Sequence, residues 1–419
     1  MFDEMPHSKK ASEGLGADCI SALPDALLHH VLGFLQAQEA VRTCMLARRW
    51  CHLWESMPVL RVTDVSRVEQ VRKFMDHLLL LRDRSNLDTC LLKFAKRSAD
   101  DEYYVRLWIR HALLCQVRLL SVSGMFVLSN RPLVSQYLTK LQLYGASLLD
   151  KFTNFSSCLA LRDLEITRCG IASDKIYSRT LERLNCHRCS FPWEVRTCIS
   201  APSVISLQLT DWMGRTPFIE DMPLLVTAVV TFGPVCEDCC GNNDPGYCED
   251  SSCAFCYGLD DGSAGSVLLR GFSAARNLKL IAKPEMFILK RDLRWCPIFR
   301  KLEILLLSEW CVADDHRALI CILRHSPVLK KLTFQLNEKE KPISLLPSKA
   351  IFNSVAKSFA SENLMSVEIK CHEVDQRVDS ILMTLVMCGI PLEKISIQQK
   401  NASSQCFSFV CTGFSSVQT

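Results

Sequence analysis

The sequence predicts an α/β chain in which a small N-terminal three-helix unit precedes an irregular solenoid of leucine-rich repeats whose strands form a parallel sheet. Three observations support this fold class: helical periodicity over residues 19–60, L-x-x-L-x-L phrases at regular intervals from Leu141 onward, and helical patterns between the later phrases. A chain of 419 residues exceeds one ordinary compact core, so we expect several domains or one elongated array.

The N-terminal segment carries three helical patterns. "LPDALLHHVLGFL" has Pro24 in its first turn and a wide apolar face, a second helix is expected near 39–46, and a third carries two tryptophans and stops at Pro58. Three helices in about 40 residues cannot bury this much apolar surface among themselves, because domains of this size usually need a metal, disulfides or a partner. Part of the surface must therefore meet the rest of the chain or a separate subunit.

This segment resembles the F-box of plant F-box/leucine-rich-repeat proteins. The resemblance rests on the Leu23-Pro24 start, on "HHVLGFL" and on "AVRTCMLARRWCHLW". In that family the segment docks on a Skp-type adaptor, which links it to a cullin–RING ubiquitin ligase. The resemblance implies that the following residues either contact the adaptor or fill the joint between the helices: Leu23, Pro24, Leu27, Leu28, Val31, Leu32, Leu35, Val41, Leu46, Trp50 and Trp54.

Two departures from the family's pattern affect this segment. Ala47 stands where the family commonly has a serine, and the loss of such a helix cap costs about 1 kcal/mol. In the first loop "QAQE" replaces a Pro-Ala-Arg-Asp-like stretch, so we expect the second helix to start without a good cap. Both departures are expected to weaken adaptor binding without abolishing the motif.

The array is expected from a recurring phrase. "LTKLQLYG", "LRDLEITRC", "LERLNCHRC" and "VISLQLTDW" set Leu141, Leu164, Leu184 and Leu207 at intervals of 23, 20 and 23 residues, which is typical of leucine-rich repeats. Side chains that alternate with the buried leucines should point out of the concave sheet. Most of them are expected to be merely solvated, but together they form a platform for a target protein: Gln142, Tyr144, Glu165, Thr167, Gln208 and Thr210.

The C-terminal part is similar to that of grass F-box/leucine-rich-repeat proteins, and its last stretch, from "ENLMSVEIKC" to "PLEKISI", is similar to the module named FBD in that family. These observations divide the chain into a flexible N-terminus, the F-box, the repeat array, FBD-like repeats and a tail. The expected boundaries are 1–18, 19–60, 61–349, 350–400 and 401–419.

A cysteine-rich insertion at 234–267 interrupts the array. Cys236-x2-Cys239 and Cys253-x2-Cys256, separated by 13 residues, match the spacing of a four-thiolate zinc site. However, the loop has few apolar residues for a core of its own, and its six cysteines exceed the needs of one site. Structural zinc, an acidic insertion without metal and a redox-labile cluster all remain open, and no other cofactor is expected.

The chain has 23 cysteines, and the state expected for those outside the insertion depends on the compartment of the protein. The N-terminus has no apolar stretch of signal-peptide length, and no apolar run is long enough to cross a membrane. We therefore expect the cytoplasm or nucleus, where thiols stay reduced. Cysteines that stand singly in apolar stretches should then pack in the core: Cys44, Cys90, Cys115, Cys321 and Cys388.

Several function classes find no support in the sequence. A net charge of +4, from 49 basic and 45 acidic residues, gives no electrostatic reason to expect nucleic acid or an anionic membrane as a partner. Neither a phosphate-binding loop nor a protease or hydrolase motif occurs, and Cys186 and His187 are adjacent, so a strand would send them to opposite faces. These absences argue against catalysis by the chain. The resemblance to F-box/leucine-rich-repeat proteins implies a non-catalytic substrate-recognition subunit of a ubiquitin ligase; the alternative is a ubiquitin-independent scaffold.

Overall fold

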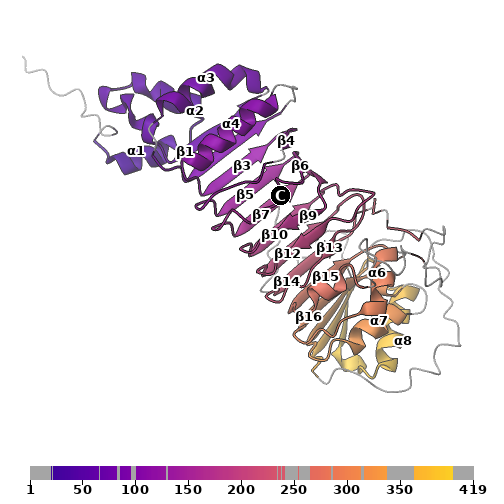
Figure 1. Cartoon of the computed structure of the whole chain (residues 1–419). Coiled ribbons are helices and arrows are strands. Elements are labelled where there is room, and N and C mark those ends of the chain that lie inside the picture. Colours follow the sequence, from indigo (N-terminus) through magenta and orange to yellow (C-terminus); the bar gives the residue numbers. More distant parts are fainter. Residues whose placement is uncertain are drawn as a thin grey trace, which may run out of the picture.

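The computed structural model describes residue 20 and residues 22–399, apart from positions 66, 83–84, 96–100, 129–130, 234, 237, 241–252, 254–264, 285, 313–315 and 337–362. The described chain is elongated, with a helical N-terminal end, a long sheet and a C-terminal end carrying three helices (Figure 1). The prediction of a mixed α/β fold built on a parallel sheet is confirmed.

Thirteen strands of the described chain form the long sheet, each parallel to the next and all in the order of the chain. They are β1 (Val59–Val65), β2 (Thr89–Phe94), β3 (Leu119–Ser123), β5 (Lys140–Tyr144), β7 (Asp163–Thr167), β10 (Arg183–His187), β12 (Ser206–Thr210), β14 (Thr227–Thr231), β15 (Asn277–Ile281), β16 (Ile304–Ser308), β17 (Lys331–Gln335), β18 (Ser366–Cys371) and β19 (Ile395–Gln399). The four leucines that define the sequence intervals pair directly across β5, β7, β10 and β12 and are buried. The sequence intervals therefore report the strand register.

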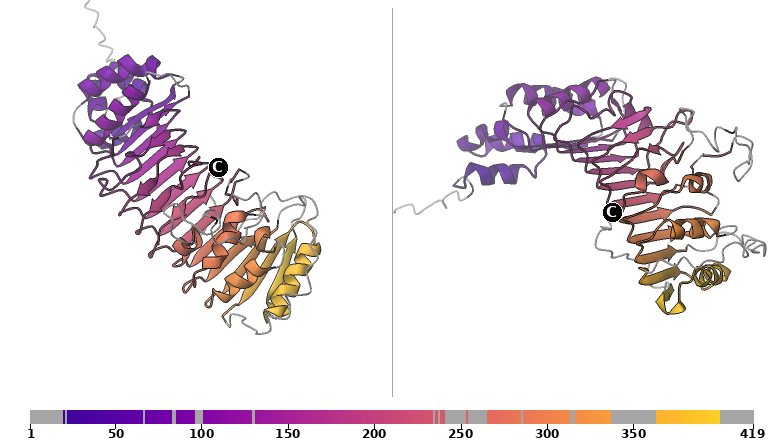
Figure 2. Two further views of the ribbon diagram at one scale, coloured as in Figure 1. Left: turned by 45° about the vertical axis from the view of Figure 1, so that its right-hand side comes forward. Right: turned by 60° about the horizontal axis from the view of Figure 1, so that its bottom comes forward.

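Different layers cover the sheet along its length (Figure 2). Near the N-terminal end the cover consists of α3 (Val68–Leu81) and α4 (Asp101–Leu114). Near the C-terminal end it consists of α6 (Phe287–Asp292), α7 (Arg317–Arg324) and α8 (Gln376–Met387). A unit of 20 to 23 residues leaves too little chain for a helix after its strand and turns, and the middle of the array uses short strands instead.

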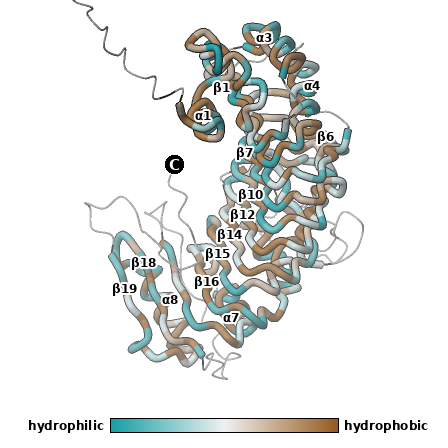
Figure 3. Tube along the Cα trace, turned by 90° about the vertical axis from the view of Figure 1, so that its left-hand side faces the viewer, coloured by the Kyte–Doolittle hydropathy of each residue, from teal (hydrophilic) through white to brown (hydrophobic). Residues whose placement is uncertain are grey.

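These short strands form two three-stranded parallel sheets that the sequence did not predict. Their members are β4 (Val127–Leu128), β6 (Ser147–Leu149), β8 (Gly170–Ala172), β9 (Lys175–Tyr177), β11 (Cys198–Ser200) and β13 (Phe218–Ile219). The helices, the short strands and the long sheet enclose one continuous hydrophobic core. The array bends, so that α1 at one end and β19 at the other lie on the same side (Figure 3).

The N-terminal unit departs from the predicted three helices. It contains α1 (Asp25–Leu32), α2 (Ala37–Arg42) and three 3₁₀ turns, η1 (Thr43–Met45), η2 (Arg48–Cys51) and η3 (Leu53–Ser56). The predicted third helix is thus wrong as a continuous helix, since it is split into η2 and η3 at His52, where φ is −117°. Ala47 precedes η2 without a side-chain cap, which agrees with the missing serine.

The expectation that the second helix lacks a cap is also wrong. The carboxylate of Glu39 accepts a hydrogen bond of 3.1 Å from the backbone N–H of Gln36, which satisfies one of the free amides at the start of α2. The side-chain amide of Gln36 in turn bonds Thr63 of β1, at 2.9 Å to the backbone N–H and 2.5 Å to the hydroxyl. The unusual "QAQE" loop therefore ties the N-terminal unit to the first strand of the sheet.

Gly214 is expected to tolerate no side chain. Its φ is +84°, and a Cβ would overlap the carbonyl oxygen of Phe191. Gly214→Ala should lower the free energy of unfolding by about 2 kcal/mol or more, because left-handed strain and a backbone clash add. Urea denaturation measures this. The control is Gly170→Ala, whose Cβ would meet only the Ser147 hydroxyl at 3.7 Å, and a comparable loss in both variants would contradict the assignment.

Candidate functional surfaces

The N-terminal unit leaves large apolar side chains in solvent. Leu27 and Val31 of α1 are about half exposed, and Phe34, which follows α1, is 68% exposed. Spacings of four and three residues place these three on one face of the helical segment. Met45 and Leu46, 86% and 72% exposed, follow α2. We call these five residues the exposed apolar set.

The structure divides the residues predicted for adaptor binding into three groups. Pro24, Leu27, Val31 and Leu46 are exposed. Leu23, Leu35 and Val41 are half-buried and pack against the core. Leu28, Leu32, Trp50 and Trp54 are buried. The sequence reasoning missed Phe34 and Met45, although the spacing of Phe34 from Val31 could have indicated it.

The two tryptophans are buried in the hydrophobic core. Trp50 is 5% exposed and Trp54 is 9% exposed, and the Trp54 indole donates a 3.0 Å hydrogen bond to the carbonyl of Cys51. An ion pair of 2.5 Å between Arg49 and Asp25 joins η2 to α1. Burial of Trp50, Trp54, Leu28 and Leu32 matches the joint-filling role of the two that the resemblance left open, since these side chains hold the unit together. Their part in adaptor binding stays a prediction.

The six residues predicted for target binding lie at the open face of the long sheet. Gln142, Glu165 and Gln208 occupy one row across β5, β7, β10 and β12, and Asn185 completes it. A second row contains Tyr144, Thr167 and Thr210, and His187 completes it. The sequence reasoning missed Asn185 and His187, although the same alternation along β10 indicates both. Cys186 between them is buried, as adjacency in a strand predicted.

Hydrogen bonds between neighbouring strands organise this open face. The carboxylate of Glu165 accepts from the Lys140 ammonium at 2.7 Å and from the Gln142 amide at 2.6 Å. One row further, the His187 ring nitrogen Nδ1 lies 2.7 Å from the Thr210 hydroxyl. The face is thus polar and pre-formed, which suits a partner that brings hydrogen-bonding groups of its own. The target-binding role of these residues stays a prediction.

Arginines border the open face at strained backbone positions. Arg168 and Arg188 directly follow β7 and β10 with φ of 52° and 51°. A non-glycine residue in this conformation costs about 1–2 kcal/mol. The cost is offset because each backbone N–H continues the ladder, donating at 2.8 Å to His187 and to Thr210. The Arg168 guanidinium also donates at 2.7 Å to the hydroxyl of Tyr144, whereas Arg188 lies 3.9 Å from the carboxylate of Asp211 after β12, so this border carries both signs of charge.

The structure describes three of the four cysteines predicted as zinc ligands. The Cys236 sulfur lies 3.3 Å from the Thr216 hydroxyl. Cys239 is exposed, and Cys253 packs with Cys240 and Phe287 in a small cluster of its own. Cys256 lies outside the described residues, so the four-thiolate zinc site stays a prediction.

Buried polar groups anchor both flanks of the insertion. Asp238 forms a 2.9 Å ion pair with Arg196, and both side chains are almost fully buried. At the other flank the buried carboxylate of Asp292 accepts from the backbone N–H groups of Val267, Leu268 and Leu269. A buried carboxylate needs such partners, because its desolvation would otherwise cost several kcal/mol.

The single cysteines follow the core prediction in part. Cys90, Cys115 and Cys388 are buried, and burial raises the pKa of the Cys90 thiol to about 12. Cys44 and Cys321 are only half-buried. A hydrogen bond from the Cys296 thiol, with help from His325 and Arg324, holds the pKa of Cys321 well below its usual value. Cys321 therefore is not a plain core cysteine.

Leu27 and Leu28 offer a direct test of which face of α1 is buried. Leu28→Ala should lower the free energy of unfolding by about 3 kcal/mol, since it removes a fully buried side chain and leaves a cavity. Leu27→Ala, at a half-exposed neighbouring position, should change it by less than about 1 kcal/mol. Urea denaturation compares the two. The reverse order would mean that α1 packs through its other face.

Within the part of the chain that the structure describes, no helix has both the length and the hydropathy to cross a membrane.

Comparison with known proteins identifies the N-terminal unit and finds relatives that cover most of the chain. Residues 20–61 match the F-box domain. The chain is 28% identical over 408 residues to a meiotic F-box protein of rice, MOF, covering 84% of this chain and 80% of that protein. It is 28% identical over 253 residues to an F-box/FBD/LRR-repeat protein of Arabidopsis thaliana, covering 51% of this chain and 60% of the relative. A second Arabidopsis protein of that name is 25% identical over 378 residues, 79% of this chain and 83% of the relative. The chain thus carries an F-box domain and is similar, over most of its length, to plant F-box and F-box/FBD/LRR-repeat proteins.

Proposed function

We propose that this protein is a substrate-recognition subunit of a Skp–cullin–F-box ubiquitin ligase. The observation that carries the proposal is the exposed apolar set on the segment that matches the F-box domain. Each large apolar side chain contributes about 1.5–3 kcal/mol when it is removed from water. A Skp-type adaptor that covers the set would supply this burial, which the part of the chain that the structure describes does not provide.

The long sheet supports the second half of the proposal. We infer that it is the sheet of a leucine-rich-repeat solenoid and that its open face receives the target protein. The polar rows through Gln142 and Tyr144 suit a target that brings amide or other hydrogen-bonding groups. The chain would hold the target close to a ubiquitin-charged enzyme and act by proximity, while the ligation chemistry belongs to other subunits.

One observation favours the alternative of a ubiquitin-independent scaffold. The uncapped, divided segment from Ala47 to Ser56 gives the F-box a less regular third element than predicted, which weakens the support beneath η1. We still favour the ligase subunit over the scaffold, because the apolar side chains of Leu27, Val31 and Leu46 are exposed and available to an adaptor. We also propose the cytoplasm or nucleus as its location, on the sequence grounds given above.

Adaptor binding is tested with two leucines of equal exposure. Leu46 in the F-box is 72% exposed, and Leu114 at the end of α4 is 73% exposed. Leu46→Ser should weaken co-purification with a Skp-type adaptor at least about tenfold, because central apolar contacts carry most of an interface's energy. Leu114→Ser should leave it unchanged. Titration by calorimetry gives the affinities. Equal affinities of all three proteins would exclude Leu46 as an adaptor contact, and an unaltered chain that does not bind the adaptor would favour the scaffold.

Target recognition is tested in the same affinity purification. Gln208→Ala combined with Thr210→Ala removes two outward side chains from β12 and leaves its buried leucines in place. The variant should retain the adaptor and lose proteins that the unaltered chain enriches. Point variants are preferable to deletion of the F-box, because that segment and β1 share one core. Retention of every enriched protein would exclude this part of the open face as the target surface.

A further inference from the structure

Three potential metal ligands that the proposed function does not use meet near the C-terminal end of the array. Cys296 directly follows η5 (Leu293–Trp295), Cys321 lies on α7, and His325 is the residue after that helix. Their sulfur and ring-nitrogen atoms all lie within 4.8 Å of one another, and all three side chains are half-buried. Within the described ranges this is the one group of its kind.

We propose that Cys296, Cys321 and His325 form a binding site for a zinc-class cation. Two thiols and an imidazole are the donors that zinc prefers, with bonds of about 2.0–2.3 Å. Donors around one such ion lie about 3.3–3.8 Å apart, so the present separations require only small side-chain rotations. Carboxylates do not take part in the group, which argues against calcium or magnesium, since both need oxygen ligands.

The backbone holds the three side chains in place. The spacing Cys321-x3-His325 spans one helical turn, so both residues project from the same side at the end of α7. The N–H of His325 donates at 3.1 Å to the carbonyl of Cys321, and the N–H of Phe299 donates at 2.8 Å to the carbonyl of His325. The second bond fixes the loop that carries Cys296 against the helix end. The group is therefore pre-organised by main-chain contacts.

A further contact orients the imidazole. Its Nδ1 atom lies 2.7 Å from the carbonyl oxygen of Cys321 and 3.8 Å from the sulfur of the same residue, so an Nδ1–H that donates to the carbonyl leaves Nε2 as the atom that would bind the ion. A backbone carbonyl that receives one ring N–H is a common means of fixing the ring and tautomer of a metal-binding histidine. Cys115 also lies beside a histidine, 3.6 Å from Nδ1 of His111, but among the described residues a second cysteine joins such a pair only at Cys321.

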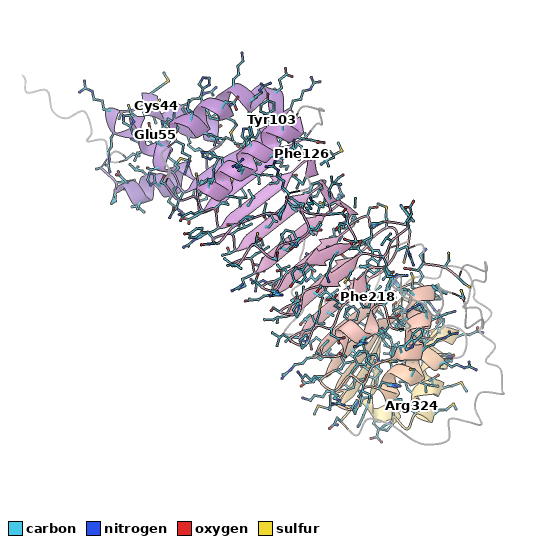
Figure 4. The ribbon with its side chains drawn as sticks, viewed as in Figure 1. Cys44, Glu55, Tyr103, Phe126, Phe218 and Arg324 are labelled. Atoms are coloured by element: carbon cyan, nitrogen blue, oxygen red, sulfur yellow. The ribbon has the colours of Figure 1, made fainter. Side chains whose placement is uncertain are left out.

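The position of the group indicates a structural role for the ion. It would join the end of η5 to the end of α7, two segments that lead into β16 and β17 respectively. Arg324, the last residue of α7, marks this place in Figure 4, at the end of the array remote from the F-box. Because an array is stabilised by contacts between neighbouring units, such a link would raise the melting temperature of its C-terminal end.

The test measures the metal content of the chain. It must distinguish zinc bound by Cys296, Cys321 and His325 from zinc bound by the cysteine-rich insertion. The full chain, co-expressed with its adaptor, carries Cys239→Ser and Cys253→Ser as a background in which the insertion cannot supply a four-thiolate site. In this background we expect about one zinc ion per chain by mass spectrometry after dialysis. Adding Cys321→Ser or His325→Gln should remove that ion. Cys198→Ser, at a half-buried thiol elsewhere in the array, is the matched control and should retain it.

A second measurement needs no variant and so does not depend on variant folding. Zinc added to the metal-free, reduced chain should slow alkylation of Cys296 and Cys321 by N-ethylmaleimide, as read by peptide mass spectrometry, and a chelator should restore it. Cys198 should alkylate at the same rate throughout. Alkylation of Cys296 and Cys321 that zinc does not change, or a disulfide between them as the resting state of the freshly isolated chain, would overturn the proposal.

Discussion

The continuous hydrophobic core is the feature on which the rest of the structure depends. It begins at Leu28 and Leu32 in the F-box and passes without interruption beneath the long sheet to Ile390. A segment of this size, with two short helices and three 3₁₀ turns, buries too little apolar surface to fold alone. By resting on β1, and through the Gln36–Thr63 hydrogen bonds, it gains the support it lacks. The F-box is therefore held by the array and not attached to it by a free linker.

This shared core also decides which side chains remain for a partner. The buried side of α1 and the two tryptophans belong to this shared core, and the exposed apolar set lies outside it. A recognition subunit benefits from such an arrangement, because a rigid joint between the adaptor surface and the target face keeps the target at a fixed distance from the charged enzyme. The curvature that brings both ends of the array to one side fits that geometry (Figure 3).

The features that the sequence predicted well are those with a period. The leucines of β5, β7, β10 and β12 recur at intervals fixed by the register, so both the strands and the outward positions between them followed from spacing alone. In the middle of the array the covering layer consists of short strands, two or three residues long, that carry no period: β4, β6, β8, β9, β11 and β13. The group around Cys321 was missed because Cys296 is distant in sequence and only the fold brings it near.

Within the F-box, a different reason limited what the sequence could predict. Leu27 and Leu28 are both apolar and adjacent, and α1 is apolar around most of its circumference, so the pattern could not show which side meets the array. The break at His52 likewise depends on packing against α1, which local propensity does not contain. Of the two departures from the family pattern, Ala47 correctly predicted a missing helix cap. The "QAQE" stretch did not leave the second helix uncapped, and it connects the segment to β1 through Gln36 and Thr63.

The central claim is that the F-box surface left open by the shared core is the surface that an adaptor covers. Hydrogen–deuterium exchange of the full chain, with and without a Skp-type adaptor, tests it most directly. The account predicts slower exchange from α1 through η1 in the complex, with β5 to β12 unchanged. Protection confined to the sheet, or no protection in the F-box at saturating adaptor, would contradict it.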